Sequence, residues 1–266
     1  MKKQGYDQII KKIKSTKNIR KIFSDYIILS KEVLLEFNDQ KNPEYYQIIF
    51  QNLIQRLYLG IMAIDTLFDK FSQINYFKYP IAIQMRACIL DSLTIAYLTQ
   101  FIDPKDPKIF KEQIQRLNQP SARELNDEIE SNIKNSNIKS SECHDSFKLA
   151  LSLYPDNFTK GSIPKLKKIN DIKLKDMVAT LKGTQLEYFN EIYKIYRHYS
   201  KYEHYGTLSK ILLEFDSEYE FDKITFSTRY VVQATLIAFI YMKIDSEKIE
   251  KLKHIKDRIL EFNKIS

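Results

Sequence analysis

Turn-forming residues are scarce in this chain, with only 5 Gly and 7 Pro among 266 residues. An all-β protein uses both residues at its many turns, and a glycine-rich phosphate-binding loop needs several Gly close together. Hydrophobic residues make up 44% and charged residues 29%, which is the composition of a globular protein rather than of a disordered chain or a multi-span membrane protein. The sequence therefore predicts an all-α fold, a bundle of about eight to ten helices.

No repeat of fixed period and no low-complexity linker divides the chain. A chain of this length can bury the core of one large domain or of two small ones. We expect a single helical domain over residues 1–266. Within it, residues 1–40 are predicted as an N-terminal helical arm.

Prolines and capping patterns indicate where individual helices begin. Pro80 precedes an apolar periodic segment, as a proline at the first helical position does. Ser121-Ala-Arg-Glu124 and Thr184-Gln-Leu-Glu187 are capping-box patterns, and the second directly follows Gly183. The first predicts the start of a polar helix, and the second the start of a strongly patterned helix that reaches about residue 204. On the helix that Pro80 opens, the predicted buried stripe consists of Ile83, Ala87, Leu90, Thr94 and Leu98.

Cysteine and histidine usage argues against a metal or disulfide framework. Cys88 and Cys143 lie far apart, and the chain has no CxxC pair and no Cys/His cluster. The carboxylates are scattered and the histidines number four, so no metal cage is expected. No cofactor site is visible either, and we expect none.

Two segments bear on localisation. The N-terminal segment is basic, but no apolar h-region or small-residue cleavage site follows it, so it does not resemble a secretory signal. The most apolar stretch is Tyr230–Met242, which is too short to span a bilayer and is predicted to form a buried core helix. We therefore expect a cytoplasmic protein with no membrane association.

The net charge of +8 is unevenly distributed. Residues 1–21 carry eight Lys/Arg against one Asp, and a second basic stretch covers residues 160–176. Basic patches attract phosphate backbones, which makes Lys165, Lys167 and Lys168 candidate nucleic-acid-binding residues. The alternative is a lysine-rich residue usage imposed by a compositionally biased genome, without a dedicated binding patch.

One group of side chains is a candidate catalytic site, and it lies in the helix predicted to reach residue 204. Arg197, Ser200 and His204 follow each other at i, i+3 and i+7. Seven residues fall only about 20° short of two helical turns, so Arg197 and His204 are expected to share one face. Tyr196 lies close to the same stripe. This arrangement combines a permanent cation, a hydroxyl and an imidazole that titrates near neutrality.

Such a set of groups suffices for RNA cleavage without a metal. An Arg fork binds phosphate oxygens bidentately and stabilises the charge that grows on phosphorus. A neighbouring His can take a proton from a ribose 2′-hydroxyl or give one to the leaving oxygen. The RNA then supplies its own nucleophile.

Arg197, the polar His198 directly after it and the six residues before His204 resemble the Arg-x4–6-His motif of HEPN domains. The resemblance covers residues 43–244, which it implies as the HEPN-like core. It implies a helical bundle, often dimeric, that acts as a ribonuclease in toxin–antitoxin, abortive-infection or CRISPR-associated systems. It implies Arg197 and His204 as the catalytic pair and His198 as a supporting residue. It further implies RNA as substrate, a homodimer, and a protein partner such as an antitoxin.

A second pattern combines Arg86-Ala-Cys-Ile-Leu-Asp91 on one helix with Tyr196-x3-Ser200-x3-His204 on a later one. It resembles a group of uncharacterised bacterial helical proteins in which an Arg-x4-acid helix is paired with a Tyr/Ser/His helix, although the usual acid there is Glu. The resemblance implies that Arg86 and Asp91 join His204 in one polar cluster. It implies no activity.

Structural roles remain open for all of these residues. A His at a helix end is often a capping residue favoured by the helix dipole, and an Arg on an apolar helix such as Arg86 needs a partner that can be purely structural. The alternative function is therefore a non-catalytic helical module that binds a protein partner or nucleic acid in a defence or regulatory system.

Overall fold

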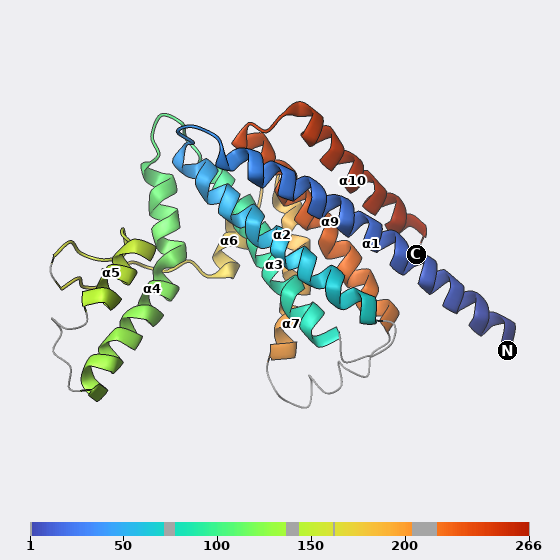
Figure 1. Ribbon diagram of the computed structural model, residues 1–266, viewed down its shortest axis with the longest axis horizontal. Helices are drawn as coiled ribbons and strands as arrows, with labels where there is room; N and C mark the ends of the chain where they lie inside the picture. Colours follow the sequence, from blue (N-terminus) through green and yellow to red (C-terminus); the bar gives the residue numbers. More distant parts are fainter. Residues whose placement is uncertain (1, 72–77, 137–143, 162, 204–216, 266) are drawn as a thin grey trace. The chain divides into compact units, whose positions relative to one another are not determined.

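The computed structural model describes residues 2–71, 78–136, 144–161, 163–203 and 217–265 (Figure 1). This part of the chain contains nine α-helices and no strand, only an isolated bridge between Phe158 and Leu166. The prediction of an all-α bundle of eight to ten helices is confirmed. The chain divides into two compact units: unit 1 comprises residues 1–97 and 178–266, and unit 2 comprises residues 98–177.

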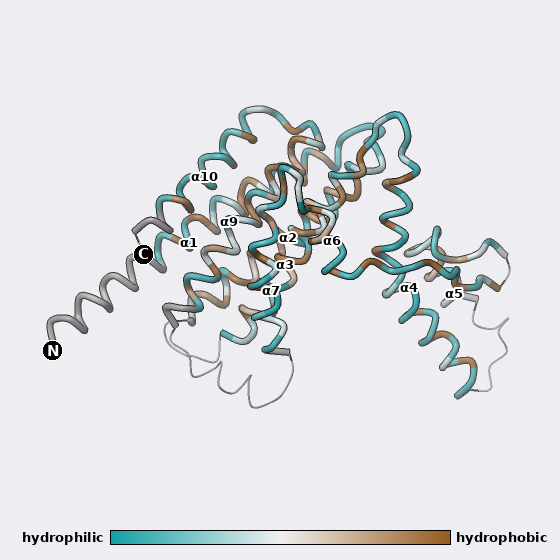
Figure 2. Tube along the Cα trace, turned by 180° about the vertical axis from the view of Figure 1, so that it is seen from behind, coloured by the Kyte–Doolittle hydropathy of each residue, from teal (hydrophilic) through white to brown (hydrophobic). Residues whose placement is uncertain are grey.

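Unit 1 is built around four helices that pack side by side. α1 (Lys2–Asn38) packs against α2 (Tyr45–Phe71) and α10 (Ser246–Ile265), and α9 (Ser217–Met242) packs against α2 and α10. α3 (Lys78–Leu98) lies against α2, and α7 (Asn190–Glu203) packs against α9. Figure 2 shows apolar segments of α2, α3 and α9 inside this bundle and a polar α10 along its outside.

Aromatic contacts and one buried hydrogen bond connect the helices of unit 1. The rings of Phe23 on α1 and Phe68 on α2 meet edge to face, with centroids 5.8 Å apart. The hydroxyl of Tyr26 on α1 lies 2.9 Å from that of Thr235 on α9, and both side chains are buried. Buried residues from Ile19 onward show that the second half of α1, in the segment predicted as an arm, is part of this core.

Unit 2 has its own small core. α4 (Lys108–Ser136) packs against α5 (His144–Leu153), and the loop after α5 covers both. Ala122 and Ile129 of α4, Phe147 and Ala150 of α5, and Phe158 of the loop form one buried apolar cluster.

α4 corrects the prediction of a helix that starts at the Ser121 capping box. The helix runs continuously from Lys108 and passes through Pro120, although a proline removes one backbone hydrogen bond and crowds the preceding turn. Buried side chains support the helix at this point: Asn157 donates to the Gln115 carbonyl and to Gln119 Oε1, both at 2.8 Å. Contacts with the loop therefore hold the helix together where the local sequence indicates a break.

α3 corrects the predicted buried stripe. Leu98 is buried, but Ala87 is exposed, while the residues between the predicted positions, such as Met85 and Ile89, are fully buried. The stretch Lys78–Phe101 is the one described segment long and apolar enough to cross a membrane, and 72% of its most apolar part lies inside the protein. This degree of burial is that of a core helix in a soluble protein. The predicted core helix at 230–242 is confirmed within α9.

Candidate functional site

Arg197 lies on α7, and the turn that precedes this helix is formed by local contacts. Gly183 adopts φ +77° after α6 (Leu174–Leu181), a conformation that glycine reaches without strain. The Glu187 carboxylate accepts the Gly183 N–H at 3.1 Å, and Thr184 Oγ1 accepts the Leu186 N–H at 3.1 Å. A 3-10 turn, Glu187–Phe189, then leads into α7. These bonds close a local turn, but they are not the reciprocal bonds of a capping box, and α7 begins at Asn190 rather than at Thr184. The predicted helix start at Thr184 is therefore wrong by about six residues.

One face of α7 is anchored to α3 through Tyr196. Arg86 Nη2 donates to the Tyr196 hydroxyl at 3.1 Å, and the guanidinium carbon lies 4.9 Å from the centre of the Tyr196 ring. Arg86 is partly buried, so stacking on the ring and the hydrogen bond together stabilise its charge. Arg86 and Tyr196, which the second sequence pattern places on a pair of helices, are therefore in contact, while the cluster with His204 that the resemblance implies stays a prediction.

The opposite flank of α7 is anchored to α9 through His198. His198 Nε2 lies 3.0 Å from Glu220 Oε1, and the Glu220 side chain is only 2% exposed. Lys223 Nζ lies 3.7 Å from the same oxygen. Sequence reasoning did not find Glu220 or Lys223, because nothing in the local pattern shows that a carboxylate more than 20 residues away faces His198.

Arg197 lies between these two anchored residues and is exposed to solvent. No other described residue forms an ion pair with it. Ser200 donates its hydroxyl to the Arg197 backbone carbonyl at 2.8 Å, which is a local helical bond. His204, the predicted partner of Arg197, lies outside the described residues, so the shared face of this pair stays a prediction.

Asp91 has a different partner from the one that the second resemblance implies. It lies five residues beyond Arg86 on α3, about 140° away around the helix, and its carboxylate pairs with Arg56 Nη2 on α2 at 2.9 Å. Burial raises the pKa of Asp91 to about 6, and the nearby Arg56 guanidinium lowers it. Arg86 and Asp91 therefore contact different neighbours, Tyr196 and Arg56.

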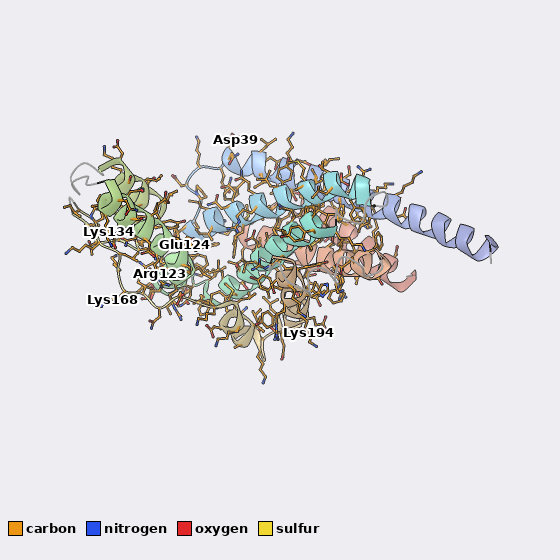
Figure 3. The ribbon with its side chains drawn as sticks, turned by 90° about the horizontal axis from the view of Figure 1, so that it is seen from below. Asp39, Arg123, Glu124, Lys134, Lys168 and Lys194 are labelled. Atoms are coloured by element: carbon orange, nitrogen blue, oxygen red, sulfur yellow. The ribbon has the colours of Figure 1, made fainter. Side chains whose placement is uncertain are left out.

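The three candidate lysines of the second basic stretch lie in unit 2. Lys165, Lys167 and Lys168 are all exposed, and Lys168 is labelled in Figure 3. The backbone is extended here, so Leu166 faces the small core while Lys165 and Lys167 point the other way. The Lys167 ammonium donates to the Asp156 carbonyl at 2.8 Å. Nucleic-acid binding by these lysines stays a prediction.

A groove of about 370 Å³ lies between α1 and α10, away from any residue singled out above. Its charged lining is balanced, with Asp25 and Glu32 facing Lys251 and Arg258, and Arg258 is paired with Asp25. A balanced lining does not attract a polyanion. Within the described residues, no group of three His, Cys, Asp or Glu could hold a metal ion.

Comparisons with protein-family models, with curated proteins and with solved structures give no match.

Proposed function

We propose that this protein is a metal-independent endoribonuclease of the HEPN type, in which Arg197 binds the scissile phosphate and His204 moves the proton. The observation that carries the proposal is the placement of Arg197. Its neighbours in sequence, Tyr196 and His198, are each held by a side chain of another helix, while its own guanidinium is exposed.

Anchoring of both neighbours matters because catalysis depends on fixed geometry. If the helix were mobile, its ordering on phosphate binding would cost conformational entropy, and the affinity of the guanidinium for the phosphate would be lower. Arg86 and Glu220 restrain α7 on two sides, so the backbone at Arg197 is positioned before RNA arrives. Only the exposed side chain has to adjust, and its fork suits two phosphate oxygens.

The proposed reaction uses the ribose as nucleophile. The imidazole of His204 takes the proton of the 2′-hydroxyl, the 2′-oxygen forms a bond to phosphorus, and the bond from phosphorus to the 5′-oxygen breaks. The products are a 2′,3′-cyclic phosphate and a 5′-hydroxyl that has received a proton. Arg197 stabilises the extra negative charge on the phosphoryl oxygens in between.

The biological setting follows from the HEPN resemblance. Such an enzyme acts as a toxin or effector in bacterial anti-phage defence. Dimerisation would bring two Arg197/His204 motifs together, and a protein partner or antitoxin would hold the activity in check. A non-catalytic helical module is the alternative, and the same experiment distinguishes it.

The test measures cleavage of single-stranded RNA by the purified full-length protein in EDTA. Wild type should cut, whereas Arg197→Ala and His204→Ala should each lose about 100-fold or more in rate. Arg197→Lys should lose most of this activity too, because it keeps the charge but not the fork. Lys31→Ala, which removes an exposed cation from α1, is the matched control and should cut normally.

Two further observations decide the mechanism. An RNA with a 2′-deoxy nucleotide before the cut site should resist cleavage there, because the nucleophile is missing. Full activity of both Arg197→Ala and His204→Ala, with circular dichroism spectra equal to wild type, would contradict the proposal. Loss of RNA integrity and growth arrest on expression in a bacterial host, in wild type alone, would support the toxin setting.

A further inference from the structure

The exposed side of α7 carries more than Arg197. Lys194 and Lys201 lie at i−3 and i+4 from it, and all three side chains are exposed; Figure 3 labels Lys194 on this helix. At 100° per residue the three cations fall within about 60° of one another. They form one basic stripe, defined by Lys194, Arg197 and Lys201.

The stripe lies opposite the buried face of the helix. Ile192 and Tyr199 are fully buried, and they lie on average about 180° from the centre of the stripe. No other described residue forms an ion pair with any of the three cations. Packing of α7 therefore exposes its three cations on one side of the helix.

The spacing of the stripe fits a chain of phosphates rather than a single one. At 1.5 Å per residue, Lys194 and Lys201 lie about 4.5 Å and 6 Å along the helix axis from Arg197. The stripe is therefore about 10 Å long, enough for two or three consecutive phosphates of one strand.

An aromatic residue flanks the stripe on one side. Tyr193 lies about 40° from Arg197 around the helix and is partly exposed. The ring of Tyr196, further round on the same flank, is stacked on Arg86. Tyr193 is thus a partly exposed ring beside the three cations, and an unpaired base can stack on a ring of this kind.

We infer that Lys194 and Lys201 bind the backbone phosphates on either side of the one held by Arg197, and that Tyr193 stacks on a base of single-stranded RNA. This inference rests on the proposed function and names its substrate-binding residues. A duplex keeps its bases stacked on each other, so only an unpaired strand can use both the cations and the ring.

The test measures binding apart from cleavage. Fluorescence anisotropy of a labelled single-stranded oligouridine is followed with the full-length His204→Ala protein over a range of KCl concentrations. Each phosphate contact contributes about 0.7 to the slope of log affinity against log salt for a single strand. The added double change Lys194→Gln/Lys201→Gln should therefore make the slope shallower by about 1.4.

The tyrosine is tested by a different signature. Tyr193→Ala should weaken binding at least about fivefold without changing the salt slope, because stacking involves no counterion, and Tyr193→Phe should restore it. The matched control is Lys21→Gln/Lys31→Gln, which removes two exposed lysines from α1 and should leave the slope within about 0.3 of the parent.

The outcomes separate this inference from the proposed function. An unchanged slope in Lys194→Gln/Lys201→Gln overturns the inference, and RNA cleavage by wild type would still stand. A shallower slope without any cleavage would support the binding stripe and contradict the nuclease. Equal affinity for an RNA duplex of the same length would overturn the single-strand assignment.

Discussion

Asp91 is a carboxylate that the core of unit 1 keeps almost completely from water. Its side chain is 5% exposed, and Arg56, the cation that it pairs with, is itself 62% exposed. A pair of this kind recovers only part of the solvation that the buried carboxylate loses. Burial therefore dominates, and the pKa of Asp91 rises from 3.8 to about 6 in spite of Arg56.

The raised pKa predicts how stability depends on pH. Folding favours the protonated carboxyl, so this group contributes most to the free energy of unfolding below pH 3.8. The contribution is lost as pH rises through about 6. Asp91→Asn should remove this loss, and the stability of the variant relative to wild type should be higher at pH 8 than at pH 4 by about 2.5 kcal/mol.

Urea unfolding at the two pH values measures the difference directly. The matched control is Asp222→Asn, an exposed carboxylate on α9, for which the difference between the two pH values should be much smaller. An Asp91→Asn protein whose relative stability is the same at both pH values would show that Asp91 is solvated in the folded protein.

Gly60 sets how closely two helices of unit 1 approach. It lies within α2, and a Cβ at this position would come 2.4 Å from the sulfur of Cys88 on α3. Helix propensity alone would favour alanine over glycine here by about 1 kcal/mol. The contact with a buried side chain reverses that preference, because overpacking a well-packed core is costly.

Gly60→Ala should therefore destabilise the protein by about 1–3 kcal/mol, measured by chemical unfolding. In the Cys88→Ala background the same change should cost less, since the sulfur that it meets is gone. A Gly60→Ala cost that is equal in both backgrounds would show that the helices move apart without difficulty.

The helices also show which boundaries local signals decide. Gly183 and the Thr184–Glu187 pattern form a turn through bonds between near neighbours in sequence, but the α-helix itself begins only at Asn190. The pattern at Ser121–Glu124 does not begin a helix, because α4 already runs through Pro120, and Asn157 from the loop after α5 donates to Gln119 on this helix. Neither capping pattern therefore marks the first residue of an α-helix in this fold.

The chain divides into two units, each with its own buried cluster. The two units can therefore unfold together or one at a time. The single domain over residues 1–266 stays a prediction, because it concerns whether both cores unfold together. Phe158 is 1% exposed in the core of unit 2. Phe158→Ala should lower the free energy of unfolding of this unit by about 3–5 kcal/mol, because it leaves a cavity in the core.

We expect Phe158→Ala to speed amide hydrogen exchange in α4 and α5 while α1, α2 and α9 exchange as in wild type. Mass spectrometry of peptides from both units reads this out. Phe23→Ala in the core of unit 1 provides the reciprocal comparison. Faster exchange throughout the chain in both variants would mean that the two units unfold as one.

The sequence by itself determined that the chain is helical, since few Gly and Pro and a strong helical periodicity are properties of neighbouring residues. It also predicted that Arg197 lies on a patterned helix, and the i, i+3, i+7 spacing of Lys194, Arg197 and Lys201 was readable there, although only the structure drew attention to it.

Only the tertiary structure decided which residues meet. α3 is apolar on nearly all sides, so the periodicity of its sequence does not show which face is buried. In the structure Met85 and Ile89 are buried and Ala87 is exposed, because of how α3 packs against the other helices. Arg56 for Asp91 and Glu220 for His198 are partners from other helices. These pairs form because segments far apart in the sequence pack against each other. A local sequence pattern does not show which distant residues come close in the folded protein.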